Sequence, residues 1–210
     1  LPGIVFGFQP KDNKSELSQK EYFLPELYIG NRAVTRAEIA SQMKNSQAWD
    51  SFLAQYGPGS VVWFDPRSGY PMSIVAPIPL IPGNGSGNQL TLQNISQQLG
   101  KPVKELTTDI VGQLFRNFII KNQAAIGIDV TQLGPVKTTK INDRLWHVTI
   151  PQVVNGIPVR WGRYLGGSNN GNLIVQAAAT WGNVKLGLNP KITSAQALKL
   201  GFDYAGGKSS

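Results

Sequence analysis

The sequence predicts an α+β protein in which a helix packs on an antiparallel meander sheet. Three apolar runs between Leu145 and Trp181 are separated by the pairs Asn155-Gly156 and Asn170-Gly171. Asn-Gly suits the positive φ of a two-residue type I′ turn, so each pair predicts a hairpin. Because apolar and other residues alternate along the runs, each run is expected to be a strand with one buried face.

The same alternation predicts which side chains of the meander face the core. In the first run Trp146 falls on the apolar side and His147 on the other side. In the second run Trp161 falls with the apolar residues, whereas Arg160 and Tyr164 fall on the opposite face. We therefore expect Trp161 in the core and the other two side chains on an outer surface.

A long helix is predicted from Asp109 to Ile126, because apolar residues recur there at intervals of three and four. Its apolar side chains form two adjacent columns, and Phe118 lies near their centre. So wide a stripe must be buried, and the meander offers a matching apolar face. We expect this helix to lie across the sheet, with Phe118 in the shared core.

Two shorter helices are expected on either side of this unit. Thr91 can cap a helix that runs through Leu99. Thr193 and Gln196 have the spacing of a capping box, which predicts a final helix. That helix would carry a stripe of three apolar side chains, Leu198, Phe202 and Ala205.

The first part of the chain predicts a smaller lobe built from a helix and a hairpin. Thr35 and Glu38 form another capping box, ahead of an apolar stripe that is interrupted at Asn45-Ser46. One kinked helix or two short helices are therefore expected, ending at 57–59. Residues 61–64 and 72–75 then predict two strands that flank a Pro- and Gly-containing turn at 65–69.

A proline stretch followed by a glycine stretch lies between Pro77 and Asn88. Such a composition is typical of a linker, stiff at first and then flexible. We therefore predict an N-terminal helix-plus-hairpin lobe over 1–81, a linker over 82–89 and a helix-on-sheet domain over 90–210.

Composition indicates a globular protein without disulfide bonds and without a predicted membrane span. The chain is 41% hydrophobic and 15% charged, and it contains no cysteine. No apolar run is long enough to predict a membrane span or a signal peptide, and Leu1 rather than Met stands first, so a processed or shortened chain is expected. The net charge of +8 arises entirely after residue 100, where thirteen Lys and Arg face five Asp and Glu. This asymmetry favours an acidic partner for the second half, although a basic balance can also serve solubility alone.

The chemistry-bearing residues disfavour an enzyme. His147 is the only histidine, so neither a His-Glu-x-x-His zinc site nor another two-histidine site can form, and no Gly-x-Ser-x-Gly elbow occurs. We expect no cofactor and no metal. Arg160 to Tyr164 interleave basic and aromatic residues as single-strand nucleic-acid binders do, but strand alternation divides that run between two faces, so nucleic-acid binding is disfavoured.

Four motifs follow one another between Leu106 and Gly206: Trp146-His147-Val148, Val154-Asn155-Gly156-Ile157-Pro158-Val159, Asn170-Gly171-Asn172-Leu173 and Pro190-Lys191-Ile192-Thr193-Ser194-Ala195-Gln196-Ala197. In this order they resemble the prodomains of thermolysin- and fungalysin-type zinc metalloproteases. The resemblance implies a propeptide module of cystatin-like α+β form that leads into a PepSY-like module. It further implies a secreted or cell-envelope protein without catalytic activity, which inhibits a zinc metalloprotease catalytic domain and assists its folding.

Two alternatives stay open. The chain can be a free-standing PepSY-like inhibitor or an envelope binding module, or, less favoured, a polyanion-binding protein. A reading frame that continues past Ser210 into His-Glu-x-x-His would decide for the prodomain. For the prodomain, the expected contact patch is the outer face of the meander, made of His147, Arg160, Tyr164 and the Asn155-Gly156 turn.

Overall fold

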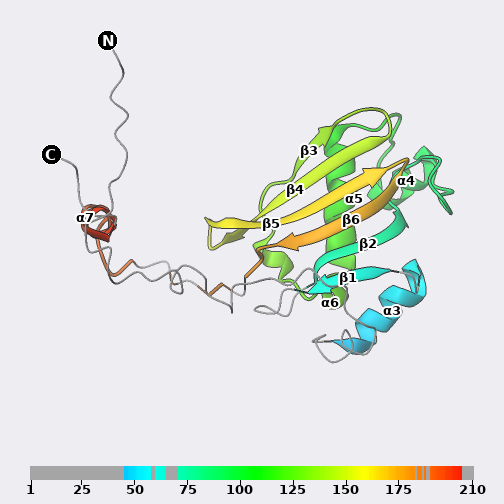
Figure 1. Cartoon of the computed structure of the whole chain (residues 1–210). Coiled ribbons are helices and arrows are strands. Elements are labelled where there is room, and N and C mark those ends of the chain that lie inside the picture. The colour runs from blue at the N-terminus through cyan, green and yellow to red at the C-terminus, as the bar shows by residue number, and fades with distance from the viewer. Residues whose placement is uncertain are drawn as a thin grey trace, which may run out of the picture. The chain divides into compact units, whose positions relative to one another are not determined.

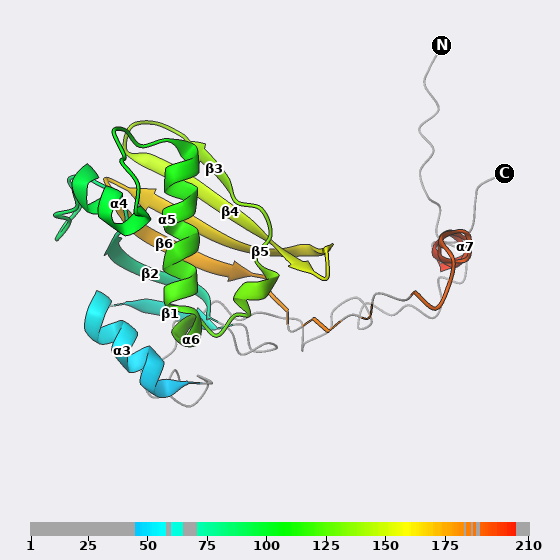
Figure 2. The same cartoon turned by 180° about the vertical axis from the view of Figure 1, so that it is seen from behind.

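The computed structural model describes residues 45–57, 60–64, 71–182, 184–185, 187 and 190–204. The chain divides into two compact units, one of residues 29–185 and the other of residues 1–28 with 186–210. In the first unit a six-stranded antiparallel sheet carries a long helix across one of its faces (Figure 1, Figure 2). The predicted α+β class is thus confirmed.

The sheet has the strand order β1-β2-β6-β5-β4-β3, and all neighbours are antiparallel. The strands are β1 (Val61–Phe64), β2 (Pro71–Pro79), β3 (Lys137–Lys140), β4 (Leu145–Val154), β5 (Ile157–Asn169) and β6 (Asn172–Ala179). The meander β4-β5-β6 turns at Asn155-Gly156 and Asn170-Gly171, where both asparagines and both glycines have positive φ. Both predicted Asn-Gly hairpins are therefore confirmed.

The helices of this unit are α3 (Ser46–Tyr56), α4 (Leu92–Leu99), α5 (Thr108–Lys121) and α6 (Gln123–Ile126), with a 3-10 turn η2 (Val130–Gln132). α5 lies across the face of the sheet that Figure 2 presents to the viewer. Phe115 and Ile119 of α5 are fully buried, and Phe118 is 8% exposed. Phe118 also packs against the rings of Phe52 and Tyr56. The predicted burial of the α5 stripe, with Phe118 in it, is confirmed.

α5 is shorter than predicted, because the chain changes direction at Asn122. The Asn122 side chain donates to the Phe118 carbonyl oxygen at 2.8 Å, and its backbone has left the helical region at φ −103° and ψ 13°. A side-chain donor that bonds a carbonyl of the preceding turn competes with the backbone ladder. One predicted helix is thus two, α5 and α6. Thr91 caps α4 through a complete capping box with Asn94, as expected for that helix.

The prediction of a separate N-terminal lobe is wrong. β2 pairs with β6, so the β1–β2 hairpin belongs to the same sheet as the meander. Trp49 and Phe52 of α3 lie in one buried cluster with Phe115 of α5. The helix, the hairpin and the meander each bury one apolar face against the others, so together they form one domain.

The predicted linker at 82–89 is an ordered loop packed against the β5–β6 turn. The amides of Leu80 and Ile81 donate to the Gly171 carbonyl oxygen at 3.1 and 3.0 Å, and the Gly85 amide donates to the Asn170 carbonyl at 2.7 Å. A Cβ on Gly83 would lie 2.3 Å from the Asn170 carbonyl oxygen. The glycines of this segment therefore permit close backbone approach and do not provide the flexibility that a linker needs.

The helix of the predicted first lobe begins at Ser46. Asn45 is its N-cap, and its side-chain oxygen accepts from the Ala48 amide at 2.9 Å. The Asn45-Ser46 interruption was therefore a helix start. The Thr35–Glu38 capping box and the turn at 65–69 lie outside the described residues.

The second unit contains α7 (Ser194–Tyr204), the predicted final helix. The Thr193 hydroxyl accepts from the Gln196 amide at 3.2 Å, and the Gln196 side chain accepts from the Thr193 amide at 2.8 Å. This reciprocal pair is the predicted capping box. Leu198 is 62% exposed, so its expected burial in an apolar stripe is not found within the described part of this unit; Ala205 lies outside that part.

Candidate functional site

The tip of the β4–β5 hairpin is the most unusual part of the sheet. Pro151 pairs with Arg163, whereas Val153 pairs with Pro158, so β5 holds three more residues than β4 between these two pairs. Figure 1 shows this hairpin reaching beyond the other strands. We call residues 152–162 the arm.

The bulge at the base of the arm reverses the predicted orientation of two aromatic residues. An odd number of extra residues moves every later side chain of a strand to the other face. Trp161 is consequently 65% exposed instead of buried, and Tyr164 is 1% exposed instead of facing solvent. The expected core position of Trp161 and the expected contact role of Tyr164 are both wrong.

Tyr164 is a core residue with a polar partner. Its hydroxyl donates to Gln176 Oε1 at 2.6 Å, and its ring lies 5.9 Å from that of Phe115 between their centroids. Burial raises the pKa of the Tyr164 phenol above its ordinary value, because the ionised form would lose its hydration. Tyr164 therefore holds the sheet to α5 and cannot take part in a surface contact.

Gln152 anchors the arm to the body of the unit. Its side chain is fully buried, donates to Gln132 Oε1 at 2.7 Å and to the Gly182 carbonyl oxygen at 2.6 Å, and accepts from the Gly182 amide at 3.2 Å. A Cβ on Gly162 would lie 2.6 Å from Gln152 Oε1, so this position admits no larger residue without a shift. The extra residues of β5 thus pack around a satisfied buried amide.

Trp161, next to Gly162 in the arm, has a strained backbone conformation. Its φ is +67°, which is rare for a bulky residue. The Thr180 hydroxyl donates to the Trp161 carbonyl oxygen at 2.5 Å and helps to hold that conformation. On the exposed side, the Arg160 guanidinium carbon lies 5.3 Å from the centre of the Trp161 ring, within cation–π distance. The arm therefore presents a stacked Arg160–Trp161 pair to solvent.

The remaining predicted contact residues are exposed but lie apart. Asn155 and Gly156 form the turn at the tip of the arm, with φ of +51° and +80°. His147 lies on β4, opposite Gly167 of β5, on the face of the sheet that α5 leaves open. The structure therefore places three of the five predicted residues, Arg160, Asn155 and Gly156, on the arm, His147 on the open face and Tyr164 in the core.

Trp161 is the functional candidate that sequence reasoning misplaced, although the sequence contains a signal for its position. Gly162 follows it directly, and a glycine within a strand often marks a bulge. Strict alternation along 157–164 ignores this signal: it assigns Trp161 to the same side as Ile157 and Val159, and it turns Tyr164 to the other side. Ile157 is itself 46% exposed, because the arm extends past the region that α5 covers.

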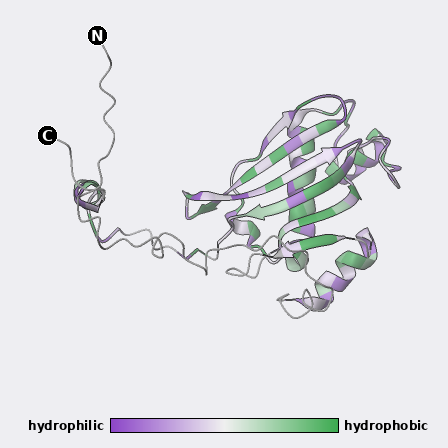
Figure 3. Cartoon of the chain, in the orientation of Figure 1, coloured by the Kyte–Doolittle hydropathy of each residue, from purple (hydrophilic) through white to green (hydrophobic). Residues whose placement is uncertain are grey.

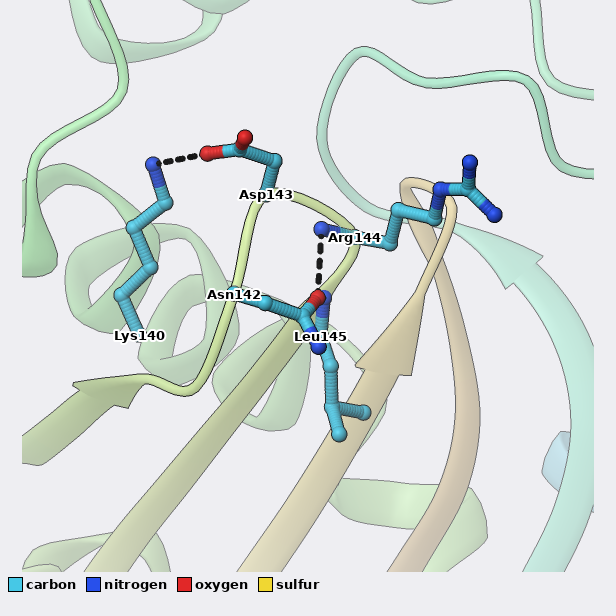
Figure 4. A network of polar contacts seen from close by, with 5 residues as sticks. All are labelled: Lys140, Asn142, Asp143, Arg144 and Leu145. Atoms are coloured by element: carbon cyan, nitrogen blue, oxygen red, sulfur yellow. Dashed lines mark hydrogen bonds and ion pairs between the residues drawn. The ribbon is translucent and has the colours of Figure 1, made fainter.

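A groove of about 500 Å³ lies at the other end of the meander, next to the β3–β4 turn. Figure 4 shows this turn: Lys140 Nζ contacts Asp143 Oδ1 at 2.8 Å, and the Asn142 side chain accepts from the Arg144 and Leu145 amides. Lys140 lowers the pKa of the Asp143 carboxyl. Since Glu105 also lines the groove, its two cations face two anions, and its charge favours no particular ligand.

Among the described residues, histidines and carboxylates nowhere gather in a group of three that could hold a metal ion. Within the same part of the chain, no helix has the length and apolar character needed to cross a membrane. Comparison with known proteins returned no matching family model, no matching curated protein and no matching solved structure.

Proposed function

We propose that the chain is the non-catalytic prodomain of a secreted zinc metalloprotease, and that it docks on the catalytic domain through the Arg160–Trp161 pair of the arm. In this role the prodomain inhibits the protease and assists its folding until removal. The order of motifs between Leu106 and Gly206, described above, is what suggests this protein class.

The observation that carries the contact is the exposed Trp161. A tryptophan that is 65% exposed contributes little to the stability of the isolated chain. Tryptophan and arginine are the residues most enriched among energetic hot spots of protein interfaces. Because Gln152 and Thr180 already fix the arm, Trp161 would lose little conformational freedom on binding.

The charge of the sheet supports an acidic partner. The strands carry His147, Lys137, Lys140, Arg160 and Arg163 but no Asp or Glu. Arg160 and Arg163 flank Trp161 and its bulge. A partner surface with an apolar pocket between carboxylates would match this arrangement, and the opposite charges would speed its association.

The test is an inhibition titration of the metalloprotease catalytic domain that is encoded in the same gene or beside it. Purified 210-residue chain is added to the separately refolded catalytic domain, and hydrolysis of a fluorogenic peptide is followed. Wild type is expected to inhibit. Trp161→Ala should raise the inhibition constant about thirtyfold, since loss of a hot spot costs about 2 kcal/mol or more.

Ile120→Ala is the matched control, because Ile120 is a 39% exposed apolar residue on α5, away from the arm. It should inhibit as wild type does. Absence of inhibition by the wild-type chain would refute the prodomain proposal. Equal inhibition by wild type and Trp161→Ala would keep the prodomain proposal and remove the arm as its contact.

A further inference from the structure

The face of the sheet opposite α5 carries apolar residues where solvent-facing positions are expected. Val61, Val75 and Val175 are directly paired across β1, β2 and β6, and each points away from a buried neighbour. Val61 and Val175 are 39% and 38% exposed. We call this side of the sheet, seen from the front in Figure 1, the open face.

A second row repeats the pattern one step along the strands. Leu165 pairs with Ala177 and Trp63 pairs with Ser73, and all four residues are partly exposed. In Figure 3, which colours the residues of both faces, β1 and long parts of β2 and β6 are hydrophobic. In an antiparallel sheet with one solvent-exposed face, apolar and polar residues normally alternate along each strand. In the two rows, Ser73 is the one polar residue that β1, β2 and β6 contribute, which indicates that their open side is covered in use.

Gly167 lies at the centre of the open face and is covered by its neighbours. Gly167 lies between Val175 of β6 and His147 of β4, and a Cβ on Gly167 would come within 3.1 Å of the Val175 side chain. Gly167 is itself buried, so the side chains of Val175 and His147 fill the space beside it.

Charge divides the open face into two parts. The apolar rows lie on β1, β2, β6 and the adjoining part of β5. Toward the other edge stand three basic residues, Arg163 of β5, His147 of β4 and Lys137 of β3. Arg163 and Lys137 are both exposed. No strand contributes a carboxylate to either part.

We propose that the open face binds an amphipathic helix of a partner protein, with an apolar stripe on the valine rows and carboxylates toward Arg163 and Lys137. Together with α5 on the other side, such a helix would complete a three-layer arrangement in which both sheet faces are covered. Six strands at about 4.8 Å spacing span about 24 Å, so a helix that crosses them all needs about 16 residues. This site lies outside the arm, although Arg163 adjoins both, and it does not depend on the prodomain proposal.

The probe is an acetylated and amidated peptide of about 18 residues that carries leucines on one face of its first half and glutamates on the same face of its second half. Binding to the ¹⁵N-labelled full chain is followed by amide chemical shifts and calorimetry. We expect the largest shifts at residues of the two rows, around Val175 and Leu165. A peptide with lysines in place of the glutamates should bind at least tenfold more weakly in low salt, and the difference should shrink as salt is added.

Val175→Lys is the decisive variant, because it places a charge in the centre of the apolar rows. Its matched control is Ile120→Lys, at a residue of nearly equal exposure on α5. Val175→Lys should weaken binding of the glutamate peptide at least tenfold, whereas Ile120→Lys should leave it unchanged. Thermal unfolding of both variants checks that each retains the fold.

Three outcomes would overturn the proposal. The first is equal binding of the peptide by wild type and Val175→Lys. The second is a set of shifted amides that lies away from the two rows. The third is self-association of the chain, by sedimentation, that Val175→Lys abolishes and the peptide does not compete with, since the open face would then be occupied by a second copy.

Discussion

Two adjacent glycines of β5 allow a direct measurement of which face of the strand meets α5. A Cβ on Gly166 would lie 2.3 and 2.4 Å from two atoms of the Phe115 ring. The nearest contacts of a Cβ on Gly167 would be Val175 at 3.1 Å and His147 at 3.8 Å. We therefore expect Gly166→Ala to be far more destabilising than Gly167→Ala.

The magnitude follows from the surroundings of each position. Phe115 is fully buried, so its ring cannot move aside without disturbing the core, and overpacking of this kind costs roughly 1–3 kcal/mol. Val175 is 38% exposed and can shift toward solvent. Alanine restricts the unfolded chain about equally at the two positions, so this contribution cancels in the comparison. Gly166→Ala should lower the melting temperature by roughly 2–4 °C for each kcal/mol lost.

Urea unfolding followed by circular dichroism measures both free energies of unfolding. The comparison depends on the bulge at the base of the arm, because an uninterrupted alternation from Trp161 would turn Gly167 toward α5 and Gly166 toward solvent. A larger loss of stability for Gly167→Ala than for Gly166→Ala would therefore refute both the bulge and the corrected positions of Trp161 and Tyr164.

Three further predictions concern single side chains. Phe118→Ala should cost about 3–5 kcal/mol by chemical unfolding, because it removes a buried ring that packs on Phe52 and Tyr56; a loss below 1 kcal/mol would contradict its place in the core. Wild type should lose stability from about pH 10 upward, because Tyr164 ionises at its ordinary pKa in the unfolded state whereas burial raises its pKa in the folded state. Tyr164→Phe should lessen that loss. An equal loss of stability in wild type and Tyr164→Phe would contradict this role of Tyr164. Trp161→Gly should leave the free energy of unfolding equal or raise it by up to about 1 kcal/mol, since glycine accepts a φ of +67° without strain, and a loss of more than 2 kcal/mol would show that Trp161 supports the fold.

The sequence predicted the elements of the first unit well because their signals are local. Both Asn-Gly turns, the cap at Thr91 and the stripe around Phe118 depend on residues within one or two turns of chain. The strand order could not be read in the same way. Pairing of β2 with β6 joins residues about a hundred positions apart, and no short motif encodes it.

Glycine accounts for the other two differences, in opposite senses. Gly83 and Gly85 were interpreted as flexible linker residues, yet they lie where the backbone of another loop, or the Asn172 side chain, leaves no room for a Cβ. Gly162 was passed over within a strand, yet it marks the bulge that exposes Trp161. Composition reveals that a glycine is present; whether it provides flexibility, close approach or a bulge depends on contacts from elsewhere in the chain.

The arm contains a well-bonded buried side chain, Gln152, next to a residue with a strained backbone, Trp161. This contrast supports the choice of Trp161 as the proposed contact. Gln152 satisfies its buried amide through Gln132 and Gly182, so the bulge itself is well supported. Trp161 then adopts a left-handed conformation that costs roughly 1–2 kcal/mol for a residue with a side chain. Little burial offsets that cost, because the side chain is 65% exposed. In the proposed docking, the contacts that offset this strain would come from the partner. Trp161, more than any residue of the core, is therefore the position at which we expect substitution to separate binding from folding.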